Sequence, residues 1–201
     1  PDAEIHVVYG STEAEPIAVL DARSNRAALL DTAKKGALVG VPVEAIRLRI
    51  HKHHEEDTFG EVWVAGPHVN KHYLDNPEAE SAHKVREGDT VWHRTGDVGR
   101  LDDQDQLWLV GRMGESVAGL WPLAVEGHAE ALTWVRQAGL IAIDDRPTLA
   151  IVLGSNPPDD WSSQLQQLTQ ADPVAVDAIP TDKRHNAKVD RVALAALLTA
   201  D

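Results

Sequence analysis

The hydrophobic pattern of the chain changes near Met113, and this change constrains the fold more than any other feature. Before that point apolar and polar residues alternate, as in residues 46–50, where two arginines separate three apolar side chains. An alternation with a period of two predicts a half-buried strand. After that point residues 123–138 have helical spacing. The sequence therefore predicts an α+β protein, with a β-rich part at residues 1–112 and a small α+β part at residues 113–201.

Strand and turn signals give more detail for the first part. Glycines frame a short apolar run at residues 61–65, and the polar residues 51–57 before it predict a hairpin loop. An acidic turn at residues 102–105 separates two further strands, at 97–101 and 107–110. The expected result is a small antiparallel, barrel-like sheet. For the second part we predict a helix at 123–138, paired strands at 140–143 and 149–153, and helices at 161–168 and 192–198.

Composition excludes several classes of function. The 201 residues contain 19 Lys plus Arg against 32 Asp plus Glu, so a nucleic-acid-binding surface is not expected. The absence of cysteine excludes disulfides and thiolate metal sites. No run of about 18 apolar residues occurs, so no membrane span is expected. These features are typical of a cytoplasmic globular protein.

Three short motifs carry chemical groups that suit one another. Tyr9–Glu13 reads Tyr-Gly-Ser-Thr-Glu and offers a hydroxyl and a carboxylate for a phosphate and its metal. Arg94–Asp97 reads Arg-Thr-Gly-Asp and, with Gly111-Arg112, offers a carboxylate and a guanidinium for a ribose. Arg184–Lys188 ends in a lysine within the densest basic cluster of the chain. Each motif alone is as typical of a turn or a solvated loop, and only their combination favours a site.

The order of these motifs resembles the adenylate-forming superfamily, which contains acyl-CoA synthetases, peptide-synthetase adenylation domains and luciferases. The resemblance covers essentially the whole chain and implies ATP or AMP and Mg²⁺ as cofactors, with a carboxylic acid as substrate. The Pro-Lys-Gly phosphate loop that the superfamily carries upstream is not found before Tyr9. We therefore expect residues 1–112 to be the C-terminal end of a large adenylation domain and residues 113–201 to be a mobile lid. The missing N-terminal part would be supplied in cis or in trans.

The resemblance also implies roles for single residues of the first motif. Tyr9 would lie against the adenine, and Gly10 would let the backbone turn sharply after a strand. Thr12 would donate a hydrogen bond to the α-phosphate. Glu13 would bind Mg²⁺, a hard cation that takes oxygen ligands.

Roles for the other two motifs follow in the same way. Asp97 would accept hydrogen bonds from the ribose hydroxyls, and Arg112 would reach the ribose or a phosphate. Lys188 would be the catalytic residue, because its ammonium neutralises charge that develops as the carboxylate attacks the α-phosphate.

The acceptor of the acyl group is less defined. Relatives that form thioesters carry an Asp or Lys two residues after Gly-Arg, where this chain has Gly114, followed by Glu115. CoA is therefore only a candidate. The sequence at residues 180–188 most resembles the β-lactone synthetases of olefin biosynthesis and related fatty-acyl-CoA ligases. This resemblance implies a fatty acid or a β-hydroxy fatty acid as the substrate. The acceptor of the acyl group would be an internal hydroxyl, CoA or another group. The alternative is a non-catalytic nucleotide-binding or regulatory half of a split complex.

Two other groups of residues are possible ligand sites. His51, His53 and His54 have spacing compatible with Zn²⁺, but no carboxylate or cysteine pattern completes a tetrahedral set, and a solvated loop is favoured. The tryptophans at positions 63, 92 and 108 lie in apolar strand contexts and are expected to be core residues.

Overall fold

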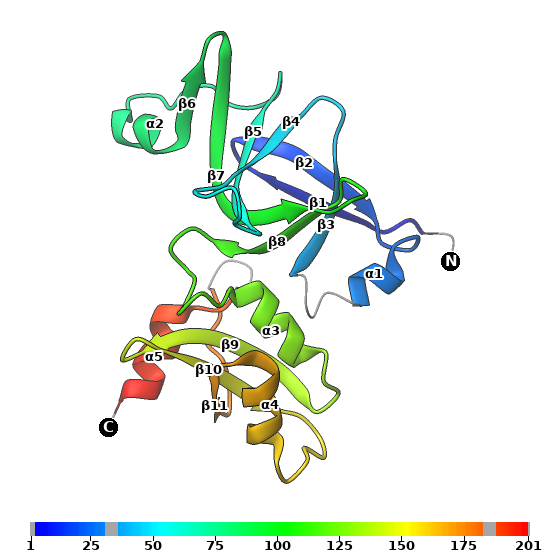
Figure 1. Cartoon of the computed structure of the whole chain (residues 1–201), viewed down its shortest axis with the longest axis vertical. Coiled ribbons are helices and arrows are strands. Elements are labelled where there is room, and N and C mark those ends of the chain that lie inside the picture. Colours follow the sequence, from blue (N-terminus) through cyan, green and yellow to red (C-terminus); the bar gives the residue numbers. More distant parts are fainter. Residues whose placement is uncertain (1–2, 31–35, 183–187, 201) are drawn as a thin grey trace. The chain divides into compact units, whose positions relative to one another are not determined.

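The computed structural model of the protein describes residues 3–30, 36–182 and 188–200. The chain forms two compact units (Figure 1): the described residues of the first are 3–29 and 37–114, and those of the second are 30, 36, 115–182 and 188–200. Gly114 has a φ of 81°, a conformation that glycine adopts without steric cost. The α+β class and the dominance of antiparallel pairing are confirmed. Among the described residues, no helix combines the length and the apolar character that crossing a membrane requires.

The first unit is built around an antiparallel sheet with strand order β1-β2-β3-β8-β7-β5-β4, and β6 pairs with β7. The predicted hairpins β4–β5 and β7–β8 are confirmed. The elements of this part of the chain are β1 (His6–Ser11), β2 (Ala14–Asp21), α1 (Arg26–Leu30), β3 (Ala37–Pro42), β4 (Arg47–His51), β5 (Gly60–Ala65), α2 (Pro77–His83), β6 (Lys84–Glu87), β7 (Thr90–Leu101) and β8 (Leu107–Arg112).

The core of the first unit lies against β2, β5 and β8. Ile17, Val62 and Leu107 have no exposed surface, and burial of such side chains stabilises a fold by about 1.5–3 kcal/mol each. Trp63 and Trp108 are buried, as expected. On another part of the sheet the guanidinium of Arg49 lies between two indole rings, 4.5 Å from Trp63 and 4.3 Å from Trp92. Trp92 is only half-buried, so the expectation that it is a core residue is wrong, and its ring packs instead against the Arg49 guanidinium.

The second unit has a three-stranded sheet, β11-β10-β9, with helices on both faces. β9 and β10 are antiparallel, and β10 and β11 are parallel. α3 and α4 share one apolar cluster with Leu140 and Ile151, whereas α5 shares a different cluster with Ile141 and Val152. Neighbouring residues of a strand point to opposite faces, so each strand serves both clusters. The elements are α3 (Pro122–Glu130), β9 (Val135–Ile143), β10 (Arg146–Leu153), α4 (Trp161–Thr169), β11 (Asp172–Ala175) and α5 (Arg191–Thr199).

The helix predicted at residues 123–138 was too long. α3 ends at Glu130, and β9 begins at Val135. Val135 and Ala138 pair with Leu153 and Ile151 of β10, so their backbone groups complete a sheet instead of another helical turn. Over only a few residues, the same apolar spacing fits either a helix or a strand. Pairing with β10 decides in favour of the strand.

Candidate functional site

Three residues that the sequence singled out lie together in the first unit. Asp97 and Arg112 are cross-strand partners in β7 and β8, and the guanidinium Nη1 lies 3.6 Å from Asp97 Oδ1. The hydroxyl of Tyr9 in β1 donates a hydrogen bond of 2.7 Å to Asp97 Oδ2. Tyr9 and Asp97 are 88 positions apart in the sequence. The sheet thus joins an aromatic ring, a carboxylate and a guanidinium in one polar cluster.

The backbone before Asp97 is fixed by its own hydrogen bonds. The Thr95 hydroxyl donates to the carbonyl of Val62 at 2.9 Å and accepts the N–H of Asp97 at 3.0 Å. Gly96 has a φ of 74°, and a Cβ atom there would lie 3.1 Å from Arg112 Nη2. The left-handed backbone conformation therefore favours glycine, and a side chain here would also displace the tip of the Arg112 side chain slightly. The Thr-Gly-Asp sequence presents the Asp97 carboxylate on a rigid support.

The pKa of Tyr9 is raised above its ordinary value, first by burial and then by the negative charge of Asp97. Its hydroxyl therefore stays protonated at neutral pH and acts as a donor. The Asp97 carboxylate is partly exposed, at 21% of its side-chain surface, and can accept further hydrogen bonds.

Glu13 lies in the turn between β1 and β2, next to the exposed Thr12. Gly10 lies within β1, so the sharp turn expected at Gly10 occurs at residues 12–13. A Cβ atom at Gly10 would lie 2.8 Å from the carbonyl oxygen of Ala14. Glycine is therefore needed here for the close approach of two strands at an irregularity in their pairing.

The carboxylate of Glu13 has the properties of a ligand for a hard cation. Burial alone would raise its pKa, but hydrogen bonds from the Tyr73 hydroxyl and around Ser11 outweigh that effect, so the pKa is lowered. Tyr73 donates to Oε1 at 3.0 Å. The Ser11 side chain and the backbone N–H of Glu13 itself also lower the pKa of this carboxylate by hydrogen bonding. An ionised, partly exposed carboxylate fits Mg²⁺, which binds proteins through one or two carboxylates together with phosphate oxygens.

The sequence did not predict the residues that pack next to Glu13, which are Tyr73, Lys84 and His93. Lys84 is only 7% exposed, and its ammonium donates a hydrogen bond to the carbonyl of Asn70. The ammonium also lies 4.9 Å from the centre of the Tyr73 ring and 3.3 Å from His93 Nδ1. Burial lowers the pKa of Lys84, and the charge of Glu13 opposes that shift. The only available signal was that Tyr73 is one of just two tyrosines in the chain.

His93 makes stability depend on pH. It is 3% exposed, and burial together with the charge of Lys84 lowers its pKa to about 4. The unfolded chain binds a proton at this histidine with a pKa near 6.5, so between pH 7 and pH 5 the unfolded state takes up more protons. We expect a loss of roughly 2 kcal/mol in the free energy of unfolding over this range. Urea unfolding at both pH values measures it.

His93→Gln should remove that pH dependence, and His53→Gln, at an exposed position, should leave it unchanged. Equal pH slopes for the protein and His93→Gln would contradict the assignment of the titration to His93.

Lys188 lies in the second unit, three residues before the start of α5. Its backbone N–H donates to Asp182 Oδ1 at 2.9 Å, and its carbonyl accepts the N–H of Asp182 at 2.8 Å. Thr181 and Val189 form a β-bridge next to this pair. The other basic residues of the motif, at positions 183–185, lie outside the described residues. The backbone at Lys188 is thus held on both sides.

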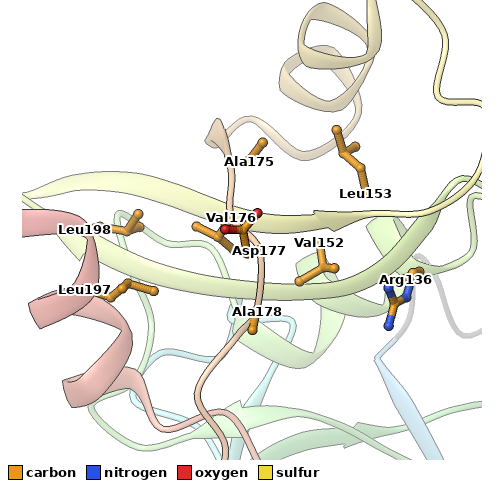
Figure 2. A pocket seen from close by; sticks show the side chains of 9 residues that line it. All are labelled: Arg136, Val152, Leu153, Ala175, Val176, Asp177, Ala178, Leu197 and Leu198. Atoms are coloured by element: carbon orange, nitrogen blue, oxygen red, sulfur yellow. The ribbon is translucent and has the colours of Figure 1, made fainter.

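A separate pocket of about 740 Å³ lies in the second unit. Figure 2 shows it between β10, the segment after β11 and α5, with Asp177 and Leu197 among its lining side chains. None of the seven site residues predicted from the sequence lines this pocket. This pocket is therefore separate from the residues that the sequence singled out.

The histidine spacing at residues 51–54 does not build a metal centre. In the described part of the chain, no group of three or more His, Cys, Asp or Glu side chains is placed to hold a metal ion. The His51 ring instead stacks on Trp63, with a distance of 4.2 Å between ring centres.

Comparison with known proteins supports the family resemblance. No family model matches the chain. An olefin β-lactone synthetase from Stenotrophomonas maltophilia is 30% identical over 239 residues, which cover 100% of this chain and 43% of that protein. The structure of a variant of an amide bond synthetase from Marinactinospora thermotolerans has a TM-score of 0.76 and 25% identity, covering 96% of this chain and 42% of the other.

The chain belongs to the adenylate-forming superfamily and corresponds to its C-terminal part. An o-succinylbenzoate CoA synthetase from Bacillus subtilis, solved with ATP and a magnesium ion, shares the fold with a TM-score of 0.70 at 24% identity, and the match covers 95% of this chain and 41% of the other. The chain spans about two fifths of the length of the relatives it matches.

Proposed function

We propose that this chain is the C-terminal part of an ATP-dependent ligase that converts a carboxylic acid into an acyl-adenylate. The observation that carries the proposal is the cluster of Tyr9, Asp97 and Arg112. Its hydrogen bond and close charge pair join three residue types that suit one nucleoside monophosphate. The ring of Tyr9 offers a flat surface for adenine, Asp97 accepts ribose hydroxyls, and Arg112 contacts the ribose or a phosphate.

The remaining motif residues take complementary roles in this proposal. Gly10 keeps the backbone of the Tyr9 strand close to its neighbour, and the exposed Thr12 hydroxyl donates to the α-phosphate. Glu13 holds Mg²⁺, which neutralises phosphate charge when bound. Lys188 stabilises the charge that develops while a carboxylate oxygen attacks the α-phosphorus and the bond to pyrophosphate breaks. Residues 113–201 act as the lid that brings Lys188 to the nucleotide.

For the acceptor we propose an internal hydroxyl of a β-hydroxy fatty acid. The β-lactone synthetase relative matches the whole chain, and the segment after Arg112 begins Met113-Gly114-Glu115, without the Asp or Lys of thioester-forming relatives. In the second step the β-oxygen attacks the acyl carbon, the hydroxyl proton is released, and AMP leaves as the four-membered ring closes. CoA or another acceptor would take the place of this hydroxyl in an ordinary ligase.

The proposal predicts that turnover depends little on CoA. In the protein that contains this chain, AMP release from ATP and a β-hydroxy fatty acid should change by less than about twofold on adding CoA, because the acceptor is already part of the substrate and its effective concentration is high. The assay follows AMP with and without CoA. The matched control is the same fatty acid without the β-hydroxyl, which should form the adenylate but turn over slowly.

Strict dependence on CoA would return the protein to the acyl-CoA ligases. If none of the tested acids promotes pyrophosphate exchange although the protein still binds AMP, a non-catalytic nucleotide-binding protein would be favoured. The two results are distinguishable because exchange reports only the first step.

A further inference from the structure

Both tyrosines of the chain donate a hydrogen bond to a carboxylate of the candidate site. Tyr9 donates to Asp97, and Tyr73 donates to Glu13 Oε1 at 3.0 Å. Tyr73 follows β5 in a segment without regular secondary structure, 60 positions from Glu13. Tyr73 belongs to none of the three sequence motifs. Its contact to only one of the two carboxylate oxygens has consequences for the metal that Glu13 prefers.

The segment that carries Tyr73 is attached to Glu13 at two points. Besides the hydroxyl contact, the N–H of Asn70 donates to the backbone carbonyl of Glu13 at 2.7 Å. The buried Lys84 ammonium donates to the carbonyl of Asn70 and lies 4.9 Å from the centre of the Tyr73 ring. These contacts hold both the backbone and the carboxylate of Glu13 relative to Tyr73.

The other side of Tyr73 is anchored as well. Its backbone N–H donates to Glu80 Oε2 at 3.0 Å, and Glu80 Oε1 accepts from Arg86 at 2.7 Å. A hydroxyl supported in this way is pre-organised for a single acceptor position.

A carboxylate can bind a cation through one oxygen or through both. Ca²⁺ takes six to eight oxygens at about 2.3–2.6 Å and readily uses both, whereas Mg²⁺ demands a near-octahedral shell at about 2.0–2.1 Å and is bound through one or two carboxylates with several waters retained. A proton donor fixed on Oε1 opposes coordination through both oxygens, so a metal ion would be bound through one oxygen.

We propose that Tyr73 is a positioning residue that restricts Glu13 to one-oxygen coordination and thereby selects Mg²⁺ over Ca²⁺. The inference rests on the proposed role of Glu13 as the metal ligand. Tyr73 itself touches neither the metal nor the substrate.

Tyr73→Phe tests the proposal because it removes only the hydroxyl and keeps the ring beside Lys84. The variant is made in the protein that contains this chain and is titrated with Mg²⁺ alone and with Ca²⁺ alone, with ATP present and no acid. Its Mg²⁺ affinity should be about tenfold lower than that of the original protein, as for other partners that orient a metal ligand. The Ca²⁺ affinity should stay within about twofold or rise. The readout is the ratio of the two affinities, which a general loss of stability would not change in this direction.

His72→Gln is the matched control. His72 is the exposed neighbour of Tyr73, and its ring lies 3.6 Å from Glu80 and not against Glu13. The control should keep the Mg²⁺ to Ca²⁺ ratio of the original protein. Glu13→Asp is a second variant that does not depend on how Tyr73→Phe folds. Its shorter carboxylate loses the contact to Tyr73, so it should also lower the ratio.

The outcomes separate the inference from the proposed function. Suppose that Glu13→Gln loses Mg²⁺ binding, but Tyr73→Phe and Glu13→Asp both keep the original ratio of Mg²⁺ to Ca²⁺ affinity. That result overturns the role of Tyr73 and leaves the proposed function intact. Mg²⁺ binding that survives Glu13→Gln overturns the assignment of Glu13 and with it the inference. A lower ratio in Tyr73→Phe, with His72→Gln unchanged, supports it.

Discussion

Replacing Lys188 with alanine is expected to abolish acyl-adenylate formation while AMP binding stays nearly unchanged. The ammonium interacts mainly with charge that develops in the transition state, so its loss lowers the rate more than ground-state affinity. By analogy with the removal of a single oxyanion donor, the barrier should rise by roughly 2.7–4 kcal/mol, a loss of about 10²–10³ in kcat. Single-turnover pyrophosphate release gives the rate, and calorimetric titration with AMP gives the affinity.

The control is Lys52→Ala, which removes the same group from an exposed loop position of the first unit. It should change neither the rate nor AMP binding. The backbone contacts between Lys188 and Asp182 use main-chain atoms of Lys188 and are retained in the alanine variant. A rate within about threefold of the original protein would contradict the catalytic role. An equal loss in rate and in AMP affinity would make Lys188 a binding residue.

The second large effect is expected in the free energy of unfolding, from Glu126→Ala. Glu126 in α3 forms an ion pair with Arg191 at the start of α5, and its Oε1 also accepts the N–H of Leu140 at 2.8 Å. Arg191 in turn donates to the carbonyl of Leu140 at 2.9 Å. Burial raises the pKa of the Glu126 carboxyl, and the guanidinium of Arg191 opposes that shift. This group connects two helices and the central strand of the second unit.

Truncation of Glu126 leaves a partly buried guanidinium and a buried N–H without their acceptor. Breaking a buried ion pair in this way costs about 3–5 kcal/mol, and because the Arg191 side chain is 25% exposed we expect a value near the lower end, about 3 kcal/mol. Urea unfolding followed by far-UV circular dichroism measures the loss. α5 begins three residues after Lys188, so the same variant should also lower the rate of adenylate formation.

Arg146→Ala is the matched control in the same unit. The ion pair between Arg146 and Asp172 has a length of 2.9 Å, but its side chains are 73% and 39% exposed. Such surface pairs contribute about 0–1 kcal/mol. A cost for Glu126→Ala no larger than that for Arg146→Ala would refute the idea that the buried group holds α5. Glu126→Met combined with Arg191→Met should recover much of the loss, because it removes both charges together.

Several elements could be predicted because their signals are local. The alternation at residues 46–50 and the acidic turn at 102–105 predicted strands and hairpins that the structure confirms as β4–β5 and β7–β8. The helices predicted at 161–168 and 192–198 correspond to α4, Trp161–Thr169, and to α5, Arg191–Thr199. Hydrophobic period and turn chemistry act over a few residues, so one sequence suffices to detect them.

The motif residues were also found from the sequence, but the roles of Tyr9, Asp97 and Arg112 remain proposals. The sequence could name these residues because their types and order matter to nucleotide chemistry. It could not show that the Tyr9 hydroxyl bonds to Asp97, a contact made across 88 positions by the folding of one sheet.

Tertiary structure alone decided where α3 ends and what surrounds Glu13. Residues 135–138 have apolar spacing that suits a helix, yet they form the start of β9 because β10 supplies a partner for their backbone groups. Tyr73, Lys84 and His93 carry no motif and meet near Glu13 through the pairing of β6 with β7 and the segment before α2. Contacts of this kind depend on which distant groups satisfy buried polar atoms, and that information exists only in the folded chain.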